Sequence, residues 1–223
     1  MKDLGKAFSF PFKDPDWVVK LLVGVVFMLL SIFLVGIFIL VGYFIQLTQR
    51  VMRQEPRPLP EWGDIGGKLI LGFKFCVVYF IYLLPIFLLM IPIIIFPLLA
   101  EISGNDDMIA LVALVYSFAY TLVVIPYSLA LTVLIPIIIY RFAERERIGD
   151  ALDLATIIRE FKHNWQNTVI VALIAMAIQS FAGVGMIVFF VGIFFTVMYA
   201  YLVSAYLTGA LYLERKTEVV KRA

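Results

Sequence analysis

Long charge-free runs constrain the fold of this chain more than any other feature. Its 18 basic and 16 acidic residues all lie outside four uncharged runs of 29, 26, 33 and 50 residues. These runs are 21–49, 75–100, 108–140 and 164–213. Because a helix needs about 20 apolar residues to cross a bilayer, the first three runs can each cross once and the last can cross twice. The chain is therefore predicted to be all-α, a polytopic bundle of transmembrane helices.

The composition excludes several other classes of protein. Hydrophobic residues make up 63% of the chain and charged residues 15%, against about 45–50% and about 25% in soluble domains. A soluble enzyme and a nucleic-acid binder are excluded on this ground. The single cysteine, Cys76, lies inside an apolar run, which excludes a disulfide scaffold. The first apolar run is too long for a signal peptide and is expected to remain as a membrane segment.

The basic residues predict the orientation of the chain. They cluster before the first run, between the first and second, between the third and fourth, and after the fourth, whereas the connection 101–107 has none. The positive-inside rule then places that connection outside. The basic loops and the C-terminus are expected in the cytoplasm, and the protein in the cell membrane.

We predict one integral membrane domain over 1–223 with five spans, approximately 18–48, 69–98, 108–140, 165–183 and 186–213. Gly183-Val184-Gly185 is the best turn signal in the last run. The first run leaves two alternatives open. A single crossing would put the four N-terminal lysines outside, whereas a re-entrant hairpin turning between Ser31 and Gly36 would keep them inside and give six spans.

Short amphipathic helices are expected at the inner interface. The clearest covers approximately 148–163, where apolar residues recur every three or four positions. Asp14, followed by Pro15, is predicted to cap a helix that enters the first run, and Asp64 to cap a helix that enters the second.

The most distinctive motif is Leu59-Pro60-Glu61-Trp62-Gly63-Asp64-Ile65-Gly66. Together with the N-terminal Pro11-Phe12-Lys13-Asp14-Pro15-Asp16-Trp17, it resembles the prokaryotic membrane-protein family called domain of unknown function 4013. The resemblance covers nearly the whole chain. It implies an integral membrane protein of a bacterium or archaeon, and it implies no activity or catalytic residue.

Three groups of residues are candidates for binding or packing. The family-like motif is either a helix boundary with Trp62 anchored at the headgroups, or a docking surface for a lipid or partner; its residues are Leu59, Pro60, Glu61, Trp62 and Asp64. Six arginines either only fix the topology or form a rim that holds anionic phospholipid; they are Arg50, Arg53, Arg57, Arg141, Arg145 and Arg147. Small residues at intervals of four predict close helix packing, within the bundle or in a homodimer; they are Ala200, Ser204, Ala205, Thr208 and Gly209.

The sequence shows no constellation for catalysis, and no cofactor or metal site is expected. His163 is the only histidine, and Asp150 is most simply a counterion to nearby arginines. The apolar runs contain no acid or histidine of the kind that ion-coupled transporters use. We therefore expect a non-enzymatic protein that organises or assists other membrane components, with the bilayer, other membrane proteins or a second copy as partners. The alternative is a permease-like component for small-molecule or lipid transport.

Cysteine labelling tests the predicted orientation. In a Cys76→Ser background, Arg57→Cys and Arg147→Cys should resist an impermeant thiol reagent in intact cells, and Asn105→Cys should react. Labelling of Arg57→Cys but not of Asn105→Cys would show that the orientation is opposite to the predicted one. Lys6→Cys separates the two alternatives for the first run, since protection indicates a hairpin and labelling a single crossing.

Overall fold

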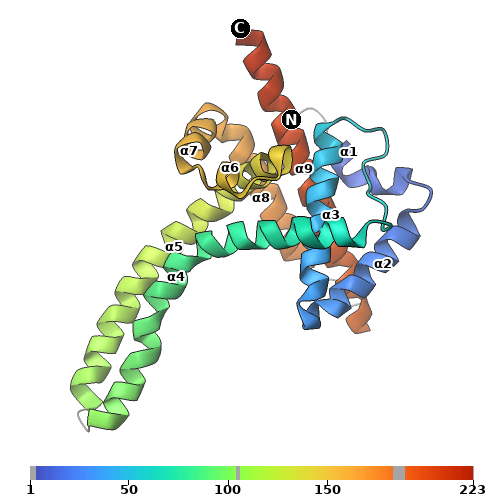
Figure 1. The fold of residues 1–223 in the computed structure, drawn as a ribbon. Helices are drawn as coiled ribbons and strands as arrows, with labels where there is room; N and C mark the ends of the chain where they lie inside the picture. The colour runs from blue at the N-terminus through green and yellow to red at the C-terminus, as the bar shows by residue number, and fades with distance from the viewer. Residues whose placement is uncertain (1–3, 104–105, 183–188, 223) are drawn as a thin grey trace. The chain divides into compact units, whose positions relative to one another are not determined.

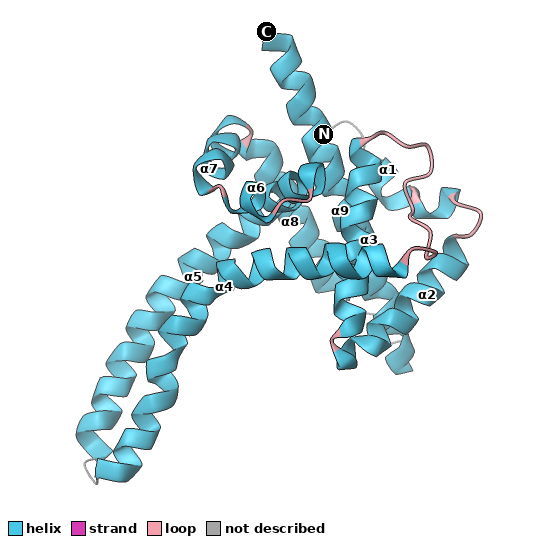
Figure 2. Ribbon diagram, in the orientation of Figure 1, coloured by secondary structure: helices cyan, strands magenta, loops and turns pink. Residues whose placement is uncertain are grey.

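The computed structural model describes residues 4–103, 106–182 and 189–222. Within these ranges the chain is helical, with connecting loops and no strand (Figure 2), so the all-α prediction is confirmed. The helices are α1 (Leu4–Ser9), η1 (Pro11–Lys13), α2 (Trp17–Leu29), η2 (Leu30–Phe33), α3 (Val35–Met52), α4 (Ile65–Ser103), α5 (Asp106–Arg145), α6 (Ile148–Leu152), α7 (Leu154–His163), α8 (Trp165–Ala182) and α9 (Phe189–Arg222). The predicted turn at 183–185 lies outside the described residues.

Four of the described helices are long and apolar enough to cross a membrane. They are Val35–Met52, Ile65–Ile102, Asp107–Arg145 and Gly192–Thr217. Two further apolar helices are shorter, Trp17–Phe33 and Trp165–Phe181. The structure is thus that of a multi-pass membrane protein, and the number of crossings stays a prediction.

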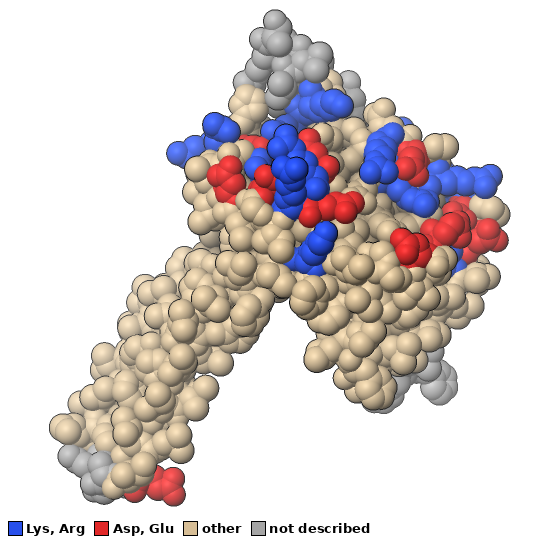
Figure 3. Space-filling model, viewed as in Figure 1, with Lys and Arg blue, Asp and Glu red and all other residues tan. Residues whose placement is uncertain are grey.

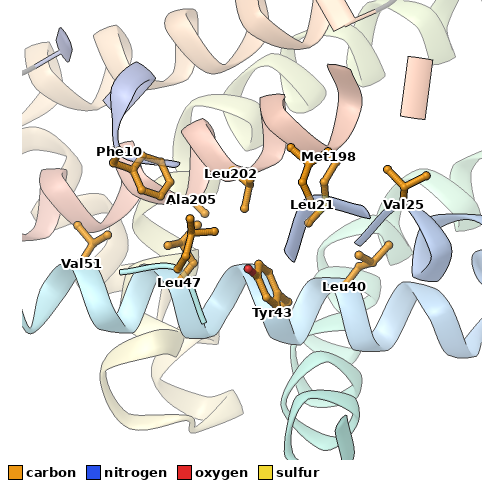
Figure 4. Packing of buried hydrophobic residues seen from close by; sticks show 11 residues of the cluster. Phe10, Leu21, Val25, Leu40, Tyr43, Leu47, Val51, Met198, Leu202 and Ala205 are labelled. Carbon is orange, nitrogen blue, oxygen red and sulfur yellow. The ribbon is translucent and has the colours of Figure 1, made fainter. Parts of the chain in front are cut away.

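The chain forms two compact units, residues 1–78 with 133–223 and residues 79–132. In the first unit, α9 packs against α3, α8, α2 and α1, and α2 packs against α3 (Figure 1). Its buried hydrophobic cluster contains side chains of α2, α3 and α9 together with Phe10, as Figure 4 shows. The buried residues include Phe10, Leu21, Val25, Leu40, Tyr43, Leu47, Val51, Met198, Leu202 and Ala205.

The first apolar run is not one helix. The span predicted over 18–48 is interrupted, because the helix breaks at η2 and Leu34, where φ is +61°, before α3 begins. α2 and α3 fold back on each other as a hairpin (Figure 1). This arrangement supports the hairpin alternative for the first run.

The predicted interfacial helix 148–163 is likewise two helices. Asp153 separates α6 from α7, and its carboxylate accepts a hydrogen bond from the backbone N–H of Thr156 at 3.1 Å. A single helix is wrong here because this cap starts a second one. The predicted cap at Asp64 is confirmed, since its Oδ1 accepts from the N–H of Gly67 at 2.9 Å. The cap predicted at Asp14 is wrong, because the α2 N-cap position is Asp16. The Asp14 carboxylate accepts from the N–H of Asp16 at 2.9 Å and also pairs with Lys20.

The second unit is formed by the parts of α4 and α5 within 79–132. Pro85 and Pro92 lie inside α4, where each lacks the N–H that a helical hydrogen bond needs. The Tyr127 hydroxyl in α5 donates to the carbonyl of Tyr82, three residues before Pro85, at 2.6 Å. The Tyr116 hydroxyl donates to the carbonyl of Leu89, three residues before Pro92, at 2.7 Å. Hydroxyl donors from a neighbouring helix are the kind of partner that makes prolines tolerable in a membrane helix.

The surface of the second unit is predominantly apolar. Large hydrophobic side chains along both helices are exposed, among them Leu88, Leu114 and Phe118 at 57%, 68% and 70%. In a bilayer, lipid or another apolar helix covers such side chains. This unit therefore supports the prediction of a membrane protein.

Close contact between helix backbones holds α4 to α3 in the first unit. A Cβ atom added at Gly72 would overlap the carbonyl oxygen of Phe38, and one added at Gly42 would overlap the backbone of Lys68. Both positions therefore require glycine, because no flexible side chain could move aside.

Gly72→Ala should destabilise the protein by about 1–3 kcal/mol, the usual cost of overpacking a well-packed contact. Thermal unfolding in detergent measures the effect. Gly66→Ala is a matched control in the same helix, since a Cβ there would meet nothing within 4 Å. Equal melting temperatures for the two variants would contradict the close contact.

Candidate functional site

The family-like motif forms the centre of a packed cluster. The Trp62 ring stacks on Tyr43, with centroids 4.1 Å apart, and on Phe27 at 5.0 Å. Its Nε1 donates to the backbone carbonyl of Lys20 at 2.9 Å. Leu59 and Pro60 are buried beside it. Trp62 is thus half-buried and packed against Tyr43 and Phe27, and both interpretations of the motif stay predictions.

Lys20 connects the two ends of the first apolar run. It is 5% exposed, and its ammonium donates to the Asp14 carboxylate at 2.8 Å and pairs with Glu61 at 2.5 Å. The start of α2 therefore lies against the segment that follows α3. Sequence reasoning placed Lys20 only among the N-terminal charges, although it is the last charge before the first run.

The electrostatics of this cluster favour ionised Asp14. Burial alone would raise its pKa, but hydrogen bonds from the Lys20 ammonium and the Asp16 N–H, together with the positive charges of Lys20 and Arg57, hold the pKa of Asp14 below its ordinary value. Arg57 itself is exposed.

A polar pocket of about 310 Å³ lies beside this cluster, between α3 and the start of α4. Its lining residues are Gln46, Gln49, Arg50, Arg53, Glu61, Gly63, Asp64 and Lys68. Arg50 donates to the carbonyl of Leu59 at 3.0 Å and lies 3.6 Å from the Glu55 carboxylate. The pocket thus combines two of the predicted rim arginines with three residues of the family-like motif, Glu61, Gly63 and Asp64.

Three of the other four rim arginines lie at the end of α5 and in the turn after it. Arg141, whose side chain is 14% exposed, contacts Glu160 at 2.8 Å and donates to the carbonyl of Asp150. Arg145 lies 3.7 Å from the Asp150 carboxylate, whereas Arg147 is exposed. The charges of Arg141 and Arg145 are therefore matched by acids of this chain, and on the drawn face basic and acidic side chains of the first unit lie side by side (Figure 3).

Glu160 is the residue that sequence reasoning missed on this side. It is 7% exposed and accepts from the Tyr140 hydroxyl at 2.6 Å, from Arg141 at 2.8 Å and from Arg215 at 2.7 Å. It thereby joins the ends of α5, α7 and α9. The available signal was its spacing, because Glu160 follows buried Ile157 by three and precedes buried Asn164 by four, on the buried face.

The small-residue strip of α9 lies against α3 at two of its members. Thr48 Oγ1 donates to the carbonyl of Ala205 at 3.2 Å, and a Cβ at Gly209 would meet Val51 Cβ at 2.7 Å. The remaining residues are buried or half-buried, namely Ala200, Ser204 and Thr208. The strip therefore lies inside the first unit at these positions.

A larger cavity, of about 840 Å³, opens near the ends of α3, α5 and α9. Its lining residues are Gln49, Met52, Arg53, Gln54, Ala143, Glu144, Tyr212, Leu213, Lys216 and Thr217. Both signs of charge line it, and the Tyr212 hydroxyl donates to Glu144 at 2.9 Å. Over the described part of the chain, no group of three or more His, Cys, Asp or Glu side chains could hold a metal ion.

The long apolar helices, the uncovered apolar side chains and the ion pairs at helix ends define an α-helical multi-pass membrane protein. Comparison with protein families is consistent with this class. The family described as "Protein of unknown function (DUF4013)" matches residues 25–197, so the chain belongs to that family, as the motif predicted. Neither the curated proteins nor the solved structures provide a match.

The Lys20 cluster predicts a stability that depends on pH. Because the pKa of Asp14 is lower in the folded state, its contribution is fully present above the unfolded pKa of about 4 and is lost as the pH falls through the folded pKa. Asp14→Asn should lower the melting temperature at pH 7. Below about pH 4, the melting temperature of this variant should decrease less with falling pH than that of the wild type. Asp16→Asn is the control on the neighbouring residue. Parallel melting curves for wild type and Asp14→Asn across pH would contradict the pairing.

Proposed function

We propose that this chain is a non-enzymatic membrane protein that organises or assists other membrane components. In this proposal it lies in the cell membrane with its basic loops and C-terminus in the cytoplasm. Its partners are other membrane proteins or a second copy of the chain.

The observation that carries the proposal is the uncovered apolar surface of the second unit. In α4, the most apolar 18-residue stretch has 0% of its residues buried. A hairpin that spans a bilayer with so little of its surface covered by its own chain is suited to packing against helices of another protein. The exposed Leu114 and Phe118 are candidate contact residues.

The ion pairs of the first unit support a non-enzymatic role. Lys20 and Glu160 connect helix ends, and the partners of their charged groups are charged or tyrosine side chains of the same unit. Such pairing stabilises an arrangement of helices, whereas a catalytic group must be free to contact a substrate.

A photo-crosslinking experiment in native membranes tests the proposal. With benzoylphenylalanine in place of Leu114 or Phe118, we expect one discrete crosslinked protein, identified by mass spectrometry. The control position is Phe181 in α8, which is similarly exposed at 73%. Crosslinks to lipid alone at Leu114 and Phe118 would overturn the proposal.

The larger cavity favours a second candidate, a permease-like transport component. About 840 Å³ with polar and apolar lining is enough for a small molecule. Flux of a solute into proteoliposomes that contain the purified chain alone would support this function instead.

A further inference from the structure

Lys68 is an unusual cation because it is buried without a carboxylate partner. It lies in the first turn of α4 and is 1% exposed. Its ammonium donates to the backbone carbonyl of Asp64 at 3.1 Å. Among the described residues, no carboxylate oxygen lies within 4.0 Å of that nitrogen, although an unpaired buried charge is costly.

The pocket that Lys68 lines holds an excess of hydrogen-bond donors. Arg50, Arg53 and Lys68 supply cationic donors, and Gln46 supplies an amide group. Gln49 also lines the pocket, but its Nε2 already donates to the Ala143 carbonyl at 3.0 Å and to Glu146 at 2.9 Å. Lysine and arginine carry no acceptor, so their free N–H groups require an acceptor from elsewhere.

The two acids at the pocket already have other partners. Glu61 pairs with Lys20, and Asp64 uses Oδ1 to cap α4 at the N–H of Gly67. Arg53 is exposed, and within the described chain it has no carboxylate within ion-pair distance. The Asp64 carboxylate keeps its negative charge, but three cationic side chains line the pocket against two acids, and Glu61 is shared with Lys20. A positive charge therefore remains at the pocket.

We infer that this pocket binds a phosphate group, with Lys68 at its base and Arg53 at its rim. Phosphate oxygens are acceptors that suit both a lysine ammonium and the paired N–H groups of an arginine. A volume of about 310 Å³ corresponds to about ten water molecules, which gives room for a phosphate and its substituent. The partial positive charge at the N-terminus of α4 adds to the attraction.

The phosphate can come from an acidic phospholipid headgroup or from a soluble phosphate ion. The pocket lies where α3 ends and α4 begins, at the ends of two apolar helices, so a headgroup could reach it. Of the six arginines in the predicted lipid-binding rim, only Arg50 and Arg53 line this pocket. Arg141 and Arg145 have acidic partners of their own. The pocket requires no protein partner at the second unit, so it does not depend on the proposed function.

Calorimetric titration of the purified full-length chain in neutral detergent tests the inference. The probes are a short-chain phosphatidylglycerol and, separately, inorganic phosphate. We expect Lys68→Met to weaken binding of the preferred probe at least tenfold and Arg53→Gln to weaken it severalfold. Arg57→Gln is the matched control, because Arg57 is exposed and does not line the pocket; it should stay within twofold of wild type.

The outcomes separate the two sources and can overturn the site. If phosphate at millimolar concentration displaces the lipid, or binds when the lipid does not, the ligand is the soluble ion; if only phosphatidylglycerol binds, the ligand is a headgroup. Should Lys68→Met fail to fold, as judged by circular dichroism and gel filtration, the exposed Arg53→Gln still decides. No binding of either probe to wild type, or binding to Arg53→Gln that equals Arg57→Gln, overturns the inference.

Discussion

The pairing of Lys20 with Asp14 and Glu61, under the stacked ring of Trp62, is the interaction on which the first unit depends. It fixes the start of α2 against the segment that follows α3, and so closes the α2–α3 hairpin at its open end. α9 then packs on the surface that α2 and α3 form together. A buried lysine is tolerable at this place because two carboxylates, those of Asp14 and Glu61, lie within ion-pair distance of its ammonium. Loss of one partner would leave a buried charge, which costs more than the pair contributes.

Buried charges must be paired, and charged residues near the helix ends therefore stabilise the packing of the helices. Glu160 repeats the principle on the other side of the unit, where one carboxylate joins the ends of three helices through Tyr140, Arg141 and Arg215. Lys68 departs from it, because its ammonium is buried with one carbonyl as its described partner. That contrast with Lys20 and Glu160 is what distinguishes the pocket beside Lys68 from the other polar clusters.

The two units meet the requirements of a membrane in different ways. The first buries tyrosines, ion pairs and small residues between its helices, so its interior resembles that of other packed proteins. The second leaves its apolar side chains uncovered, and two tyrosine hydroxyls bond carbonyls near Pro85 and Pro92. A hairpin of this kind gains little from burying its own surface, so lipid or a partner protein must supply its surroundings.

The sequence by itself determined the class, the family and most helix positions, because uncharged runs of 26 to 50 residues leave few alternatives to membrane helices. It also placed the cap at Asp64, since capping depends on a few neighbouring residues. Only the tertiary structure decided that 21–49 is interrupted at Leu34, that Asp14 pairs with Lys20 rather than capping α2, and that Glu160 is buried. For the ion pairs, the physical reason is that Lys20 and Glu160 also have partners distant in the chain: Glu61 lies 41 residues from Lys20, and Arg215 lies 55 residues from Glu160. Spacing can place Glu160 on the buried face of α7, but it does not identify Arg215 as its partner.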